Sequence, residues 1–165
     1  STHPLRPVYD YAAIRAHWGD IPDIKIRYAP DETGWAKQLS PQHACLANIS
    51  TTVELRLYDI VEMEEDEDPA FIPWAGECFQ TYYTYTLRIR YPAGATQFAT
   101  RRTLQALSRI LTAVDGALEG LVSGFALANV PPQCDIEAVL ATLHQEPGVQ
   151  ASVVRHELDE ENPDV

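Results

Sequence analysis

Three cysteines and five histidines are the residues best suited to bind a metal or to act as nucleophiles. Structural zinc sites hold such ligands in closely spaced pairs. Here Cys45, Cys78 and Cys134 lie more than thirty residues apart, and only His43 is close to one of them, two residues before Cys45. We therefore expect no metal site, and we expect the cysteines to be reduced thiols with a packing role.

An acidic run is the most unusual local feature of the sequence. Six of the seven residues from Glu62 to Asp68 are Asp or Glu, and Met63 is the exception. Calcium-binding loops space their oxygen ligands and need a glycine at the turn. Consecutive acidic side chains cannot all point at one ion, and this run contains no glycine. The pattern is instead typical of a solvated loop, because like charges repel each other and stay in water.

Motifs for catalysis and for nucleotide binding are missing from the sequence. The chain contains no G-x-S-x-G nucleophile motif, no G-x-G-x-x-G motif and no G-x-x-x-x-G-K-[ST] phosphate loop. A pairing of Cys45 with His43, His144 or His156 would depend on a fold that nothing in the sequence predicts. We expect a protein that is not an enzyme and has no cofactor. An enzyme of unrecognised type would need histidines and carboxylates that converge in a cleft.

The net charge narrows the classes of partner. The 165 residues include 12 Lys or Arg and 24 Asp or Glu, which gives a formal net charge of −12. The acidic run and a second segment, 157–164, carry 11 of the acids and no base, so 13 acids stand against 12 bases elsewhere. A nearly neutral body with two acidic segments argues against general binding to nucleic acid or to an anionic membrane.

Hydropathy indicates a folded chain that is not embedded in a membrane. Hydrophobic residues make up 45% of the sequence, and no stretch reaches the roughly 18 apolar residues of a membrane span. Residues 1–7 lack the apolar core of a signal peptide. Together with the small number of cysteines, these features predict a soluble, reduced, intracellular product.

Hydrophobic periodicity predicts the elements that must position these side chains. Helices are expected at 10–19, 96–115 and 135–146. Asp10, Thr96 and Asp135 are the predicted N-caps of these helices. Strands are expected at 23–29, 51–63, 81–91, 125–130 and 149–158. Residues 30–50 lack clear periodicity and are predicted to form a long loop.

The two strongest strand patterns predict a long extended β-hairpin. Strands 51–63 and 81–91 are expected to pair antiparallel, with 64–80 as the loop and the acidic run at its tip. The predicted fold class is α+β: a mostly antiparallel sheet, packed on one face by one main helix and a second, C-terminal helix. We expect a single domain over 1–158 and an acidic, flexible tail over 159–165.

Five arginines accompany the second strong strand and the main helix. They form a solvated face or, on a sharper hypothesis, receive an acidic segment from a neighbouring copy of the chain. On that hypothesis the interaction residues are Glu62, Glu64, Glu65, Asp66, Glu67, Asp68, Arg88, Arg90, Arg101, Arg102 and Arg109.

The stretch 51–115 resembles the tail-terminator, or neck, proteins of tailed bacteriophages. The resemblance lies in the order of four segments: TTVELRLYDIVEM, EEDEDPAFIPWAGECF, TYYTYTLRIRYPA and TQFATRRTLQALSRILTAV. It implies a virion structural subunit, without enzymatic activity or cofactor, that forms a ring, commonly a hexamer. Such a ring caps the tail tube and joins it to the head connector, and DNA passes through its lumen. The resemblance implies assembly in the host cytoplasm and no membrane partner.

A ring also follows from the physics of the predicted hairpin. A hairpin longer than its sheet needs a second subunit to cover it, and heterologous contacts that close produce rings. The alternative hypothesis is a small acidic inhibitor or immunity-type protein, in which the acidic run masks a basic partner protein.

Overall fold

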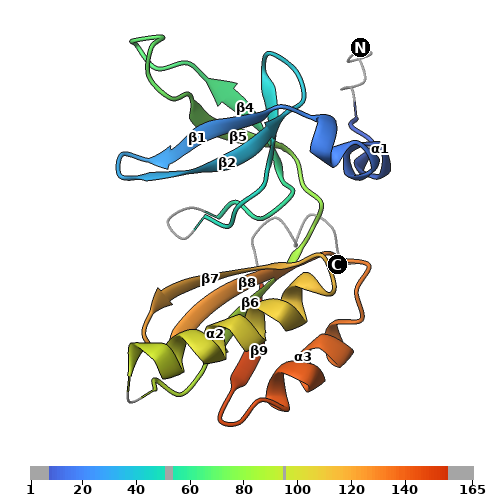
Figure 1. Ribbon diagram of the computed structural model, residues 1–165. Coiled ribbons are helices and arrows are strands. Elements are labelled where there is room, and N and C mark those ends of the chain that lie inside the picture. Colours follow the sequence, from blue (N-terminus) through green and yellow to red (C-terminus); the bar gives the residue numbers. More distant parts are fainter. Residues whose placement is uncertain (1–7, 51–53, 95, 156–165) are drawn as a thin grey trace.

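The computed structural model describes residues 8–50, 54–94 and 96–155 and divides them between two sheets (Figure 1). The N-terminal part contains α1 (Tyr11–Ala16), a 3-10 turn (Trp18–Asp20) and five strands. These strands are β1 (Asp23–Ala29), β2 (Glu32–Gln38), β3 (His43–Leu46), β4 (Ile60–Glu64) and β5 (Trp74–Gln80). The C-terminal part contains β6 (Tyr85–Arg90), α2 (Gln97–Thr112), β7 (Ala117–Val122), β8 (Phe125–Val130), α3 (Ile136–His144) and β9 (Gln150–Val154).

Strands β1 to β5 form a closed barrel. Each strand pairs antiparallel with the next, and the barrel closes through a parallel contact between β1 and β5 at Arg27 and Trp74. Closure must be parallel, because a meander with an odd number of strands ends in the direction in which it began. Small residues make room inside: a side chain at Gly34 would lie 2.7 Å from the ring of Tyr28. Closure leaves this sheet without a free edge.

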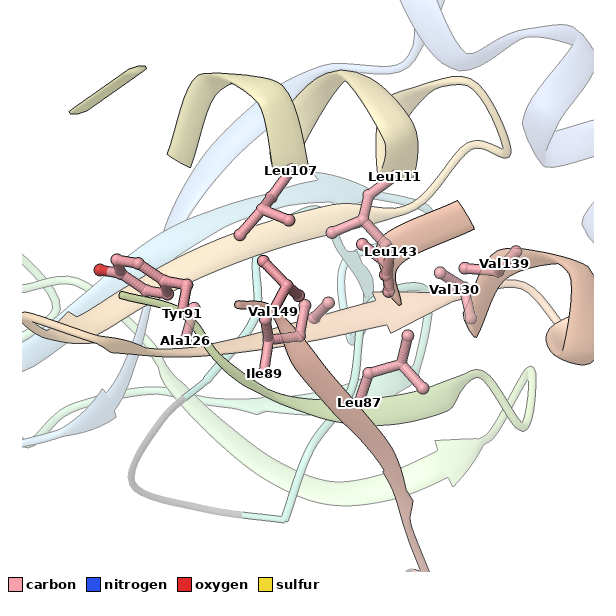
Figure 2. Close-up of a cluster of buried hydrophobic side chains, with 11 residues drawn as sticks. Leu87, Ile89, Tyr91, Leu107, Leu111, Ala126, Val130, Val139, Leu143 and Val149 are labelled. Atoms are coloured by element: carbon pink, nitrogen blue, oxygen red, sulfur yellow. The ribbon is translucent and has the colours of Figure 1, made fainter. Parts of the chain in front are cut away.

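The C-terminal part follows the order β6-α2-β7-β8-α3-β9, with the sheet order β7-β8-β6-β9 and antiparallel pairing throughout. This is the split βαβ arrangement of ferredoxin-like folds. Both helices lie on the same face of the sheet (Figure 1). Leu87 and Ile89 of β6 meet Leu107 and Leu111 of α2 and Leu143 of α3 in a core from which water is excluded (Figure 2).

The structure confirms the α+β class, the main helix, the C-terminal helix and the three predicted N-caps. The Asp10, Thr96 and Asp135 side chains accept hydrogen bonds from the backbone N–H groups of Ala12, Ala99 and Ala138. These caps satisfy backbone donors that the first helical turn leaves without partners.

The predicted pairing of 51–63 with 81–91 is wrong. Strand β4 pairs instead with β5, which lies in the stretch expected to be loop, and β6 belongs to the other sheet. The acidic run still lies at a hairpin turn, but the hairpin is the shorter β4–β5 pair. The expected loop 30–50 contains β2 and β3. Residues 51–53 of the predicted strand and the tail 159–165 lie outside the described residues.

Two tyrosines explain why both predicted strands break. Tyr58 and Tyr83 have φ angles of 68° and 56°, in the left-handed region that side chains seldom adopt. Tyr83 lies where the chain passes from β5 of the barrel to β6 of the four-stranded sheet, and Tyr58 lies just before β4, where the connection from β3 returns to the barrel. There the segment 54–59 runs beside 81–84, through hydrogen bonds among Arg56, Asp59 and Thr81. We call this buried polar contact the joint.

Replacing Gly148 with alanine is expected to lower the free energy of unfolding by about 2–4 kcal/mol. Gly148 has φ of 73°, and a Cβ atom there would lie 2.5 Å from Cγ of Pro92. The substitution therefore combines backbone strain with a collision against the Pro92 ring. Urea unfolding measures the loss. The control is Gly19→Ala, because no atom lies within 4 Å of a Cβ built at Gly19; equal losses in both variants would contradict the prediction.

Candidate interaction surface

The structure divides the five predicted arginines between opposite faces of the C-terminal sheet. Arg88 and Arg90 of β6 are exposed, whereas their sequence neighbours Leu87 and Ile89 are buried under the helices. Alternation along the strand places Arg88 and Arg90 on the face without helices. Arg101, Arg102 and Arg109 lie on α2 and therefore on the helical side. The prediction that all five form one cluster is wrong.

Strand register defines the composition of the face that the helices leave uncovered. Residues that pair across a sheet share a face. One row runs Glu119, Leu127, Arg88, Ser152, and the next contains Phe125, Arg90 and Gln150. We call these two rows the arginine face. It places two exposed guanidinium groups beside two half-buried apolar side chains, Leu127 and Phe125. Within the described residues, neither arginine takes part in an ion pair.

The joint covers the adjacent third row and so limits the arginine face. The backbone N–H of Leu57 donates to Oδ1 of Asn129 at 2.9 Å, and Nδ2 of Asn129 donates to the Thr86 hydroxyl at 2.9 Å. Asn129 is 1% exposed and Leu57 is 4% exposed. The asparagine thus satisfies a backbone donor that would otherwise be buried without a partner. The sheet is closed to solvent at this end and open at Arg88 and Arg90.

The acidic run lies at the β4–β5 turn, at the end of the barrel away from the four-stranded sheet (Figure 1). Asp66 accepts hydrogen bonds from Nε1 of Trp74 at 3.0 Å and from the N–H of Asp68, and Asp68 accepts one from the N–H of Ala70. The bond from Trp74 is the main cause of the lowered pKa of Asp66. These bonds order the turn, and Phe71 within it remains 57% exposed. We call residues 64–73 the acidic loop.

The candidate thiol and histidine groups have structural partners. Burial raises the pKa values of Cys45 and Cys78 to about 12, so both are protonated thiols at neutral pH. The Nδ1 atom of His43 lies 2.9 Å from the Tyr9 hydroxyl. The backbone N–H of Ala151 donates a hydrogen bond to Nε2 of His144 at 3.1 Å. His156 lies outside the described residues. Among the residues that the structure describes, no three His, Cys, Asp or Glu side chains are placed to hold a metal ion.

One pocket lies between the first half of α2 and the edge strand β7. It has a volume of about 640 Å³ and is lined by apolar side chains, hydroxyl groups and one arginine, Arg101. Its lining contains no carboxylate and no histidine, so the pocket offers no acid–base pair for catalysis. Within the described ranges, no helix has the length and apolar character needed to cross a membrane.

Sequence reasoning missed Phe125 and Leu127 as parts of a surface, and it missed the joint. Phe125 and Leu127 were expected in a short buried strand, because a run of apolar residues does not show that one face of its sheet stays open. One residue in the sequence does point to the joint: Asp59 interrupts the alternation of apolar and polar residues in the strand predicted at 51–63.

Comparison with known proteins finds little. No family model and no curated protein matches this chain. A solved structure of a hypothetical protein from Neisseria gonorrhoeae is similar, with 14% sequence identity and a TM-score of 0.44, over 80% of this chain and 92% of that one. A similarity of this size carries no argument about function.

Proposed function

We propose that this protein is a non-enzymatic structural subunit that assembles with copies of itself into a ring. One observation carries the proposal: the chain bears an exposed arginine face and an exposed acidic loop at opposite ends (Figure 1). Within one subunit these two surfaces are separated by the barrel and the joint. They are complementary in charge, and they can meet only between subunits.

A contact between two different surfaces of the same chain is heterologous. Each added subunit leaves one free surface of each kind, so assembly continues and gives a ring where the rotation between neighbours closes, or an open filament where it does not. An overlong hairpin does not support the ring, because β4 and β5 are short strands within a closed barrel. The separation of the acidic loop from the arginine face supports it instead.

Within this class, the resemblance of the stretch 51–115 favours a tail-terminator or neck subunit of a tailed bacteriophage. Its partners would be the tail tube and the head connector, its ring a hexamer and its location the virion. The acidic excess of the chain, −12 overall, suits a lumen through which DNA slides without binding.

Assembly is expected to depend strongly on salt. Raising the ionic strength from about 0.05 M to about 1 M shortens the Debye length from over 10 Å to about 3 Å and screens contacts between exposed charges. Mass photometry and sedimentation velocity should show closed oligomers at low salt and smaller species at high salt. A chain that stays monomeric at every salt concentration, also when mixed with tail-tube and connector proteins, would contradict the proposal.

The second candidate is the acidic inhibitor or immunity-type protein. The observation in its favour is the ordered acidic loop, since hydrogen bonds from Trp74, Asp68 and Ala70 hold a preformed anionic surface. Reversing the charges of Glu64, Glu65, Asp66 and Glu67 separates the two functions. An inhibitor would lose one basic partner and the salt dependence of its association rate, whereas a ring subunit that assembles through the acidic loop would lose self-assembly.

A further inference from the structure

We propose that the acidic loop of one copy docks on the arginine face of a second copy, with Phe71 as its apolar anchor. This inference rests on the proposed self-assembly and names the two surfaces that make the contact. It assigns the role of acceptor to Arg88 and Arg90 and excludes Arg101, Arg102 and Arg109 from it.

The arginine face has the composition of an interface centre. Arginine and aromatic residues dominate the binding energy of protein interfaces, especially where apolar side chains surround them. Leu127 lies directly across from Arg88, and Phe125 lies directly across from Arg90. The two arginines are two residues apart on one strand, so their Cα atoms are separated by about 7 Å. Pairing with β8 and β9 on both sides keeps this spacing rigid.

The acidic loop offers matching groups. The side chains of Asp66 and Asp68 are engaged in ordering the turn, whereas the carboxylates of Glu65 and Glu67 form no hydrogen bond or ion pair with the described residues. Both glutamates are available for charge-assisted bonds to guanidinium groups. Phe71 is exposed in the same loop. Because the loop is already ordered, docking costs less conformational entropy than the ordering of a free segment would.

The arginines of α2 are less suited to this contact. Phe98 is 69% exposed and lies three and four residues before Arg101 and Arg102, so the helix also carries an aromatic residue near two arginines. However, these arginines extend from a helix, whereas Arg88 and Arg90 lie on a sheet face directly across from two half-buried apolar side chains. Arg101 and Arg102 of α2 therefore provide a matched control, because together they carry the same charge as Arg88 and Arg90.

The decisive experiment is a charge swap. One variant carries Arg88→Glu and Arg90→Glu, and a second carries Glu65→Lys and Glu67→Lys. Each variant alone is expected to weaken self-association at least about tenfold in sedimentation velocity. An equimolar mixture of the two should restore assembly, because each mutated surface then meets its complement. Circular dichroism checks that each variant is folded, and Arg101→Glu with Arg102→Glu is expected to leave assembly unchanged.

The anchor is tested separately with Phe71→Ala, which is expected to weaken self-association about 30-fold, as loss of a hot-spot side chain does. Phe98→Ala is the control and should have no effect. Equal effects of the two substitutions would overturn the role of Phe71.

Other occupants of the arginine face give different results. If removal of residues 156–165 abolishes assembly while the loop variant assembles normally, the acidic C-terminal segment is the occupant and the inference is wrong. Binding of a single-stranded oligonucleotide that the Arg88→Glu, Arg90→Glu variant loses would also overturn it. Assembly that survives both charge variants refutes this inference but leaves the proposed function standing, whereas a wild-type chain that is monomeric under all conditions refutes both.

Discussion

Replacing Arg56 with methionine is expected to lower the free energy of unfolding by about 3–5 kcal/mol at neutral pH, because removal of one partner of a buried charged pair leaves the other uncompensated. Arg56 is 1% exposed in the joint. Its guanidinium donates to the carbonyl oxygen of Thr84 at 3.0 Å and to the Thr81 hydroxyl at 3.2 Å. Methionine fills a similar volume but removes these donors and the positive charge near Asp59, which is fully buried.

Urea unfolding at neutral pH measures this loss. The control is Arg102→Met, which removes an exposed arginine of α2 and is expected to change stability by at most about 0.5 kcal/mol. A loss below about 1 kcal/mol for Arg56→Met would show that the joint contributes little to stability. A change in the slope of unfolding against urea would instead show that the barrel and the C-terminal sheet unfold separately once the joint is broken.

The second large effect is a pH dependence that originates at Asp59. Burial raises the pKa of this carboxyl from 3.8 to about 6, although hydrogen bonds from Thr81 and from the Arg56 backbone, and the charge of Arg56, act in the opposite direction. Between these two pH values the folded chain binds a proton that the unfolded chain has released. The free energy of unfolding therefore falls as the pH rises through this window. The shift corresponds to about 3 kcal/mol.

Asp59→Asn removes this titration. We expect the stability of the wild type relative to this variant to be greatest below pH 3.8 and to fall by about 3 kcal/mol by the time the pH exceeds 6. Unfolding curves for both chains across this range measure the difference. Asp20→Asn, at an exposed position, is the control and should show no comparable change. A constant difference between wild type and Asp59→Asn would show that Asp59 has the same pKa in the folded and unfolded chains.

Local signals in the sequence predicted the helices well. The three N-caps depend on residues within a few positions of one another. Leu107 and Leu111, which lie four residues apart in the helix expected at 96–115, are fully buried between α2 and the sheet. Such interactions are decided by spacing along the chain, and the sequence displays spacing directly.

The strands show where the sequence was insufficient. The alternation at 81–91 correctly indicated the strand Tyr85–Arg90, and of the strand expected at 51–63 the described residues contain only Ile60–Glu64. Neither pattern identified the partner of its strand. Because hydrogen-bonding partners in a sheet can come from any part of the chain, two strong patterns close in sequence suggested a hairpin that the structure does not contain. The left-handed φ angle of Tyr83 occurs where the chain passes from the barrel to the C-terminal sheet, and that of Tyr58 occurs just before the chain enters β4.

The arginine face and the acidic loop also combine features that the sequence shows with features that only the fold decides. The sequence by itself determined that the excess of acidic over basic residues is concentrated in two segments, that one of them forms a turn, and that Arg88 and Arg90 share one side of a strand. Only the tertiary structure decided that this side is open, that Phe125 and Leu127 lie beside the arginines, and that the arginines of α2 are on the opposite face. It also placed Arg56 and Asp59 together in the joint. Charge and periodicity are properties of neighbouring residues, whereas exposure of a sheet face depends on where every other element packs.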